Sequence, residues 1–322
     1  MSPSPQPPTP RTAVFICGAT GSQGGSLAHH LRSKLDWQVR TTVRNPDSPA
    51  ARDLVAAGVQ VSQGDWDDTS PSGTAALSAA MAGCTKLFLC LLPDFSDMTR
   101  EPRQAAHILS AAKAAGITQV VASTSLGVFT LEHEPDVLEG GIMAAHLANK
   151  AAVEDAVRNG GFASWTLLRP SFFMANFLEP KVERYPEPRD RGTWTTALTA
   201  ETPLGLVDHV DIAAYAAAAL QDPESFHRRA VGLASELLTV QETLDLLGRA
   251  VPGGRPMKAV FMTDEEVAER QKTSHVFTNS QVSMRHAFRY IDMEGIRSVI
   301  RTTSFRDFLE REQEGVRRTY SK

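Results

Sequence analysis

The sequence predicts an α/β protein: a Rossmann-type, doubly wound parallel sheet followed by a smaller, mostly helical α/β C-terminal domain. Three observations support this. Apolar strand-like runs alternate with helix-like segments through the first half of the chain. A glycine-rich turn follows the first of these runs. After Pro170 the alternation gives way to a stretch rich in Pro, Arg and Glu, and then to helix-like segments.

Length and composition narrow the function classes. The 322 residues are 42% hydrophobic, which is enough for a large core, and the net charge of −4 argues against a nucleic-acid partner. No apolar run approaches the roughly 18 residues needed to cross a membrane. The three cysteines lack metal-ligand spacing, so we expect no metal site and a reducing, cytoplasmic location, with nuclear entry left open.

The first strand and helix enclose a glycine loop. The run Val14 to Cys17 ends at Gly18, and two more glycines follow at three-residue steps. Gly18 would permit a tight turn, Gly21 would let the backbone approach a pyrophosphate, and Gly24 or Gly25 would let the helix pack closely. The spacing is G-x-x-G-x-x-G, so it differs from the commonest dinucleotide fingerprint. We predict a dinucleotide cradle; the alternative is a purely structural turn.

The remaining elements follow in order. Further strands are expected at 37–43, 59–65, 86–92, 119–125 and 165–169, and helices at 26–35, 48–58, 71–81, 103–115 and 143–159. Residues 181–203 predict a loop or short hairpin, 206–220 a strand, turn and helix capped by Asp208 or Asp211, and 240–250, 264–273 and 305–318 helices. We therefore predict a disordered tail (1–10), a dinucleotide-binding Rossmann domain (11–170, rejoined by part of 204–235) and a smaller substrate or partner domain (171–322).

The end of the second predicted strand indicates which dinucleotide binds. An acidic residue commonly stands there and accepts a hydrogen bond from the ribose 2′-hydroxyl of NAD. This chain has Arg44, whose guanidinium suits a 2′-phosphate instead. Asp47 could cap the next helix and need not oppose that phosphate. The residues favour NADP(H); the alternative is a surface arginine without a partner.

The ends of the other predicted strands carry further candidates, because ligands bind at this edge of an open sheet. Asp65 could accept a hydrogen bond from an adenine amino group or be an ordinary turn aspartate. The chain from Leu91 to Pro93 would run beside the cofactor ribose. Ser125 ends a run of three hydroxyl residues. About twenty residues later, His146 and Lys150 are four apart and share a helix face, with Lys150 either facing the ribose or solvated.

These segments, together with Leu168 to Phe177, resemble the NmrA-like family of atypical short-chain dehydrogenase/reductases. The resemblance covers about residues 11 to 220 well and the C-terminal hundred residues weakly. It implies a cofactor in the cleft between two domains, with Lys150 at the nicotinamide ribose. The implied contacts are Gly18, Ala19, Thr20, Gly21, Ser22, Gln23 and Gly24 at the pyrophosphate, Arg44 and Asn45 at the 2′-phosphate, Asp65 and Trp66 at the adenine, Leu91, Leu92 and Pro93 along the ribose, and Pro170, Ser171, Phe172 and Phe173 at the nicotinamide.

One residue departs from the wider group's Tyr-x-x-x-Lys motif, because His146 stands where the proton-donating tyrosine would be. Histidine donates a proton well only as imidazolium, from an unperturbed pKa of about 6.5. An ammonium about 5 Å away would lower this pKa, so Lys150 is expected to keep His146 neutral. The motif thus supports cofactor binding more firmly than catalysis.

Two function classes stay open, with a third less favoured. The first is an NADPH-dependent reductase of a C=O, C=N or C=C bond in a small organic molecule, with Lys150, His146 and Ser125 as catalytic residues. The second is an NADP(H)-binding redox sensor with a protein partner and no turnover; the third is an isomerase or epimerase. An apolar substrate pocket could involve Phe172, Phe173, Met174 and Trp194, which could equally be core residues.

Overall fold

A computed structural model describes residues 12–138, 141–272 and 276–321. The tail predicted for residues 1–10 lies outside these ranges. None of the helices in the described part of the chain is both long and apolar enough to cross a membrane.

The centre of the molecule is a seven-stranded sheet in which every pairing is parallel, with the order β10-β6-β5-β4-β1-β2-β3. Its strands are β1 (Ala13–Ile16), β2 (Gln38–Val43), β3 (Gln60–Gln63), β4 (Lys86–Cys90), β5 (Gln119–Ser123), β6 (Ser164–Pro170) and β10 (Arg229–Leu233). The strand order reverses between β1 and β4, and the glycine loop follows β1 at this switch point. Parallel α/β sheets bind ligands there, and the predicted doubly wound fold is confirmed.

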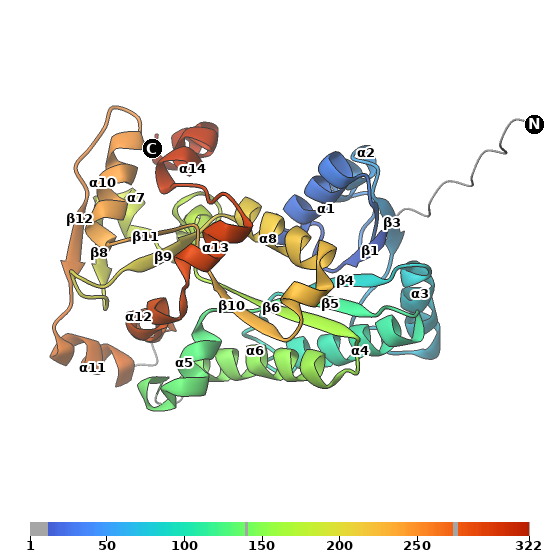
Figure 1. The fold of residues 1–322 in the computed structure, drawn as a ribbon. Helices are drawn as coiled ribbons and strands as arrows, with labels where there is room; N and C mark the ends of the chain where they lie inside the picture. The colour runs from blue at the N-terminus through green and yellow to red at the C-terminus, as the bar shows by residue number, and fades with distance from the viewer. Residues whose placement is uncertain (1–11, 139–140, 273–275, 322) are drawn as a thin grey trace, which may run out of the picture.

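Helices cover both faces of this sheet (Figure 1). One layer contains α1 (Ser22–Leu35), α2 (Pro49–Ala56) and α8 (His209–Gln221), and the other contains α3 (Pro71–Met81), α4 (Arg100–Ala114) and α6 (Gly141–Asn159). The central strands β1 and β5 are buried from both sides, which explains their nearly continuous apolar runs, whereas the edge strand β3 is mostly exposed and polar.

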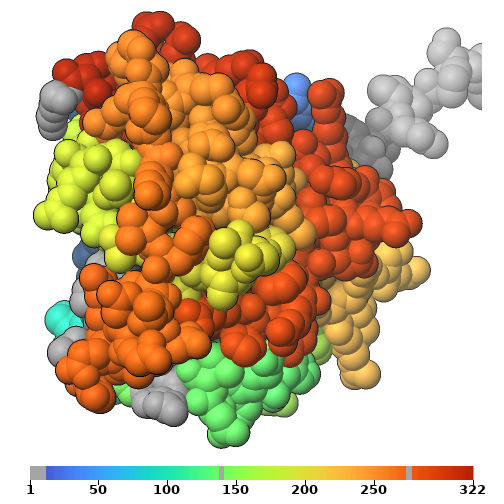
Figure 2. Space-filling view, turned by 90° about the vertical axis from the view of Figure 1, so that its left-hand side faces the viewer, coloured from blue at the N-terminus to red at the C-terminus, as the bar shows by residue number. Residues whose placement is uncertain are grey.

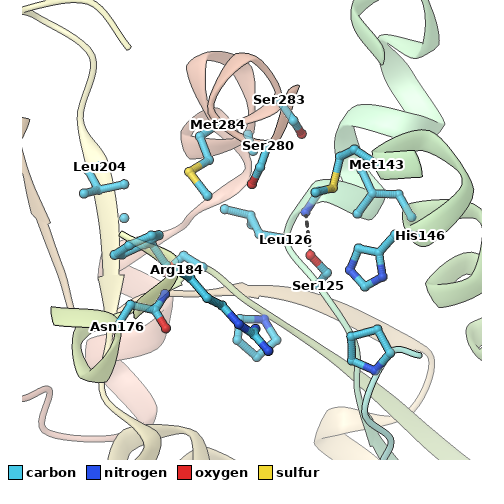
Figure 3. Close-up of a pocket in the computed structure, with 18 of the residues that line it drawn as sticks. Ser125, Leu126, Met143, His146, Asn176, Arg184, Leu204, Ser280, Ser283 and Met284 are labelled. Carbon is cyan, nitrogen blue, oxygen red and sulfur yellow. Dashed lines mark hydrogen bonds between the residues drawn. The ribbon is translucent and has the colours of Figure 1, made fainter. Parts of the chain in front are cut away.

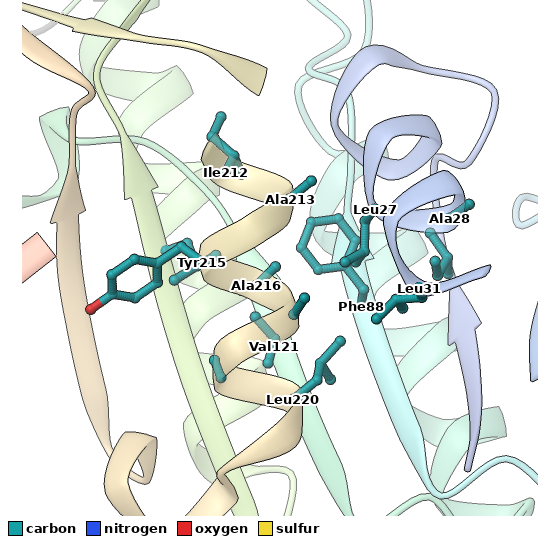
Figure 4. Close-up of a cluster of buried hydrophobic side chains, with 14 of the residues drawn as sticks. Leu27, Ala28, Leu31, Phe88, Val121, Ile212, Ala213, Tyr215, Ala216 and Leu220 are labelled. Carbon is teal, nitrogen blue, oxygen red and sulfur yellow. The ribbon is translucent and has the colours of Figure 1, made fainter. Parts of the chain in front are cut away.

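The pairing of α1 with α8 brings the second half of the chain back onto the N-terminal sheet. Leu27 and Leu31 of α1 and Ala216 and Leu220 of α8 are fully buried over Phe88 of β4 (Figure 4). The four consecutive alanines near the end of α8 leave room for close packing. Asp208, one of the two predicted caps, accepts a hydrogen bond from the Val210 N–H at 3.2 Å and begins the helix.

The C-terminal region packs around a second core, which contains Phe177, Trp194 and Phe305. The region contains two small sheets. The first has the strand order β11 (Glu236–Leu238), β9 (Leu204–Val207) and β7 (Phe172–Phe173). The second pairs β12 (Lys258–Phe261) with β8 (Thr193–Thr196). Helices α10 (Val240–Ala250), α14 (Phe305–Arg311) and α15 (Gln313–Tyr320) bury side chains in this core. The same region contains α7 (Glu187–Arg191), α11 (Asp264–Lys272) and α12 (Val276–Ala287). In contrast, α9 (Pro223–Phe226) and α13 (Met293–Val299) pack against the core of the N-terminal sheet. Figure 2 shows the face that these orange and red segments form, with the green α5 (Gly127–His133) at its lower edge.

Two predicted elements are wrong. Residues 181–203 form no hairpin, because β8 pairs in parallel with β12, a strand that follows some sixty residues later. The single helix predicted for 305–318 is two helices that break at Glu312. This change of direction lets Phe308 of α14 and Tyr320 of α15 bury in the same core.

Candidate functional site

The glycine loop has the backbone geometry of a close ligand approach. Gly18 has a φ of +74°, and a Cβ there would lie 2.8 Å from the carbonyl oxygen of Cys90. A Cβ at Gly24 would lie 2.5 Å from the carbonyl oxygen of Gly18, whereas one at Gly25 would be 3.0 Å from the nearest atom. Gly24 is therefore the position where α1 comes closest to the loop.

The first turn of α1 is open to an anion. Gly21 caps it without a side-chain hydrogen bond, and its first turn contains no acidic residue. Free N–H groups and the helix dipole favour negative charge at such an end. The Ser123 hydroxyl donates to Gln23 Oε1 at 2.6 Å and ties the loop to β5. From the C-terminal region, Lys181 Nζ reaches Ser22 Oγ at 3.4 Å.

Arg44 stands exposed at the end of β2, and within the described part of the chain its guanidinium has no hydrogen bond or ion pair. Asn45 Oδ1 accepts from the Asp47 N–H at 2.9 Å, which shapes the turn beside it. Asp47 does not cap the next helix as expected, because Ser48 is the residue whose side chain accepts from Ala51 N–H. Arg44 is thus free to bind an anion.

The predicted adenine-side residues have structural partners. Asp65 Oδ1 accepts from Asp67 N–H at 3.0 Å, as an ordinary turn aspartate does. The Trp66 indole donates to Thr42 Oγ1 at 2.9 Å, so Trp66 packs beneath the sheet edge. Leu91 is buried, but Leu92 is 83% exposed, an unusual position for a large apolar side chain. Contacts of these residues with adenine and ribose stay predictions.

A pocket of about 450 Å³ opens at the carboxyl ends of β4, β5 and β6. Its N-terminal wall consists of Pro93, Phe95, Ser125, Leu126, Gly127, Ile142, Met143, His146, Leu147, Pro170, Ser171 and Phe172. Its C-terminal wall consists of Asn176, Arg184, Tyr185, Leu204, Gly205, Ser280, Ser283, Met284, Ala287 and Phe288. Figure 3 shows the two walls facing each other, with Met284 opposite Met143. No aspartate or glutamate is among these described lining residues.

The three hydroxyls at the end of β5 have different partners. Ser123 donates to Gln23, and Thr124 donates to Glu154 Oε1 at 2.6 Å. Ser125 accepts from Gly127 N–H at 3.3 Å, and its oxygen faces the pocket (Figure 3). Only Ser125 therefore keeps a hydroxyl proton available to a ligand.

His146 lies in the same wall, with its ring centroid 5.6 Å from that of Phe95. Burial lowers the pKa of its imidazole from 6.5 to about 4, and the charge of Lys150 adds to this. The predicted neutral state is supported, but its expected main cause is wrong, because desolvation outweighs Lys150. Its buried Nδ1 has no hydrogen-bond partner among the described residues, and neither has the Ser171 hydroxyl.

Lys150 is buried and does not line this pocket. Its ammonium donates to the Leu91 carbonyl at 3.1 Å and forms an ion pair with Glu101 of α4. The alternative of a solvated lysine is thus wrong, and sequence reasoning missed Glu101. The ammonium reaches the end of β4 along which the ribose is predicted to lie, and ribose binding stays a prediction.

A buried ion cluster supports the N-terminal wall from behind. Arg169 and Glu154 are fully buried and pair at 2.6 Å, and Arg169 also reaches Glu132 of α5. The Arg169 guanidinium lies 4.0 Å from the ring centroid of Phe129. Since Glu154 also accepts from Thr124, the cluster fixes the segment that carries Ser125.

The predicted apolar pocket residues divide between two environments. Phe172 lines the pocket, but Met174 and Trp194 are buried in the C-terminal core and do not. Phe173 lies beneath the Lys181 ammonium, 5.4 Å from its ring centroid. Most of the C-terminal wall was missed: α12 has no glycine motif or capping signal, and Arg184 lies in the stretch expected to be a loop.

Comparison with known proteins agrees with this geometry. The profile of the NmrA-like family matches residues 10–304. A (4-alkanoyl-5-oxo-2,5-dihydrofuran-3-yl)methyl phosphate reductase of Streptomyces griseus is 31% identical over 76% of this chain and 75% of its own length. An NAD(P)H azoreductase of Xenophilus azovorans is 30% identical over 80% of this chain and 79% of its own. The crystal structure of NmrA, a negative transcriptional regulator, superposes with a TM-score of 0.69 at 18% identity, covering 95% of this chain and 98% of that one.

Proposed function

Because this chain belongs to the NmrA-like family, we propose that it is an NADPH-dependent reductase of a C=O, C=N or C=C bond in a small organic molecule. The observation that carries this proposal is the apolar pocket into which Ser125 and His146 face, at the same edge of the sheet as the glycine loop. Two of its relatives are reductases that act on different compounds, which supports the reaction class.

The residues fit an NADP(H) molecule. Gly18 to Gly24 would hold the pyrophosphate against the open end of α1, since any side chain at Gly24 would collide with the Gly18 carbonyl. Arg44 would bind the 2′-phosphate, and Lys150 would donate to the nicotinamide ribose. When bound in its reduced form, the cofactor supplies the hydride.

The chain's own groups would polarise the acceptor. The Ser125 hydroxyl and an N–H of neutral His146 can each donate a hydrogen bond to an oxygen or nitrogen of the substrate. At neutral pH His146 lacks the acidic proton of an imidazolium, because burial lowers its pKa to about 4. We therefore assign it the role of a hydrogen-bond donor; the proton comes from water or from an acid on the substrate.

A second candidate is an NADP(H)-binding regulatory protein without turnover. The poor acidity of His146, together with the likeness in fold to a negative transcriptional regulator, favours it. This function needs a partner that distinguishes the oxidised from the reduced complex.

Oxidation of NADPH at 340 nm, followed against a panel of aldehydes, imines, enones, quinones and azo compounds, separates the two candidates. Turnover that falls at least 100-fold in the Lys150→Met variant, but not in a variant of an exposed helix lysine, Lys272→Met, supports the reductase. Tight NADP(H) binding with no turnover on any panel member contradicts it and supports the regulatory candidate.

A further inference from the structure

The pocket has a one-sided charge. Arg184 is the one ionised side chain among its described lining residues, because His146 is neutral and no carboxylate is present. An exposed guanidinium beside an apolar cavity attracts an anion rather than a neutral or cationic ligand.

Among the described residues, no acidic side chain pairs with Arg184. Within the described part of the chain its guanidinium has no hydrogen bond or ion pair, although Glu183 precedes it directly. The Glu183 carboxylate instead pairs with Arg189. Lys181 adds a second positive charge, and burial and the charge of Arg184 lower the pKa of its ammonium. The local excess of positive charge is therefore built into this segment.

The residues on either side of Arg184 fix its position. Val182 is fully buried, and Tyr185 donates its N–H to the Val182 carbonyl at 2.8 Å. The Tyr185 ring packs against Phe172, with centroids 5.2 Å apart. Arg184 is thus held at the pocket between two anchored neighbours, and in Figure 3 it extends toward the wall that carries Ser125 and His146.

Lys181 and Arg184 point to different parts of the site. Lys181 reaches Ser22 of the glycine loop, on the cofactor side. Arg184 lines the pocket instead, near apolar side chains such as Leu204 and Met284. A ligand that contacts both the Arg184 guanidinium and these apolar side chains has a hydrophobic body and one acidic group.

We propose that the pocket selects an apolar organic anion, a flat hydrophobic molecule whose carboxylate, sulfonate or phosphate group is bound by Arg184. This rests on the proposed function only in taking the same pocket as the substrate site. The anionic group would form a paired hydrogen bond with the guanidinium, and the hydrophobic body would extend toward Ser125 and His146, where the reducible bond would lie.

Calorimetric titration of the NADP⁺-loaded protein with 2-naphthoate and with its neutral isostere 2-naphthamide tests this without any turnover. We expect the naphthoate to bind at least 10-fold more tightly than the amide, and Arg184→Gln to abolish that preference. The matched control is Arg191→Gln, which removes an exposed positive charge of the same segment outside the pocket and should keep the preference. NADP⁺ affinity should be unchanged in both variants.

Equal binding of the two probes by the native protein overturns the proposal, as does a preference that survives Arg184→Gln. A loss of NADP⁺ affinity in Arg184→Gln also overturns it, since Arg184 would then belong to the cofactor side. The outcome is separable from that of the reductase assay. If naphthoate binding depends on Arg184 but no acceptor is reduced by NADPH, this inference holds and the reductase proposal fails. If only neutral acceptors are turned over, the reductase proposal holds and this inference fails.

Discussion

The two walls of the pocket are built in different ways. The N-terminal wall stands on three neighbouring strands, and the buried pair of Arg169 and Glu154 fixes the segment that carries Ser125 from behind. The C-terminal wall combines a 3₁₀ turn, η3 (Lys181–Arg184), with β9 and α12, and within the described part of the chain its guanidinium at Arg184 has no hydrogen bond or ion pair. From this contrast we propose that the first wall holds the groups that polarise the reducible bond, whereas the second selects the substrate.

We expect the largest effect on stability from a substitution in the buried ion cluster that supports the N-terminal wall. Arg169→Met would remove the fully buried partner of Glu154 and leave this buried carboxylate with only the partly exposed Arg158 as a described ion-pair partner. We therefore expect the free energy of unfolding to fall by about 3 kcal/mol or more. Urea denaturation measures this. Lys272→Met, which removes an exposed ion pair with Glu269, should change stability by less than about 0.5 kcal/mol. Similar losses in both variants would show that the buried cluster supports nothing.

The pH dependence of stability tests the buried imidazole of the same wall. The folded-state pKa of His146 is about 4, below the unfolded value of 6.5. The unfolded chain therefore binds more protons in between, and stability falls as the pH drops from 6.5 to 4, by up to about 3 kcal/mol. His146→Phe should remove this part of the acid sensitivity in denaturation curves at pH 7 and 4.5. An unchanged difference between the two curves would mean that His146 is not desolvated.

The close contact between Gly24 and the Gly18 carbonyl predicts the next largest effect, which is on cofactor affinity. Gly24→Ala places a Cβ 2.5 Å from the Gly18 carbonyl oxygen, so we expect the NADP⁺ dissociation constant to rise by about 100-fold, or about 3 kcal/mol. Gly315→Ala is the control, because its Cβ would make an ordinary contact with Leu178 at 3.4 Å in another helix. Native affinity in the Gly24 variant would refute the close approach of loop and helix.

Cofactor choice gives a smaller effect. Arg44→Ala should weaken NADPH binding by about 10–30-fold, because one charge-assisted contact to the 2′-phosphate is lost at an exposed site. NADH binding should change less than twofold. Fluorescence titration with both cofactors measures the ratio, and equal losses would remove Arg44 from the phosphate site.

A substitution in the C-terminal wall should have the smallest effect on stability and should mainly weaken substrate binding. Met284 is only partly buried, so Met284→Ala should cost less than about 1 kcal/mol of stability and leave NADP⁺ affinity unchanged. The KM for an apolar acceptor should rise several-fold. A large fall in kcat at constant KM would place Met284 in the chemical step and erase the distinction between the walls.

The contrast also explains how far sequence reasoning reached. The N-terminal strands, the loop at Gly18 and the cap at Asp208 depend on local patterns, because each needs particular residues at fixed spacing. The ion pair of Lys150 with Glu101 and the place of α12 in the pocket depend on contacts between segments far apart in the chain. The sequence left Trp194 as a candidate for either the pocket or the core, because an aromatic ring suits both, and only the folded structure places it in the C-terminal core.

The central claim is that the glycine loop, the open end of α1 and Arg44 form a binding site for NADP(H). Isothermal titration of the purified protein with NADPH and with NADH tests it most directly. We expect saturable, one-to-one binding of NADPH at low micromolar concentration or tighter, and at least 10-fold weaker binding of NADH. An absence of binding heat and of any thermal shift with either form of NADP would contradict the account.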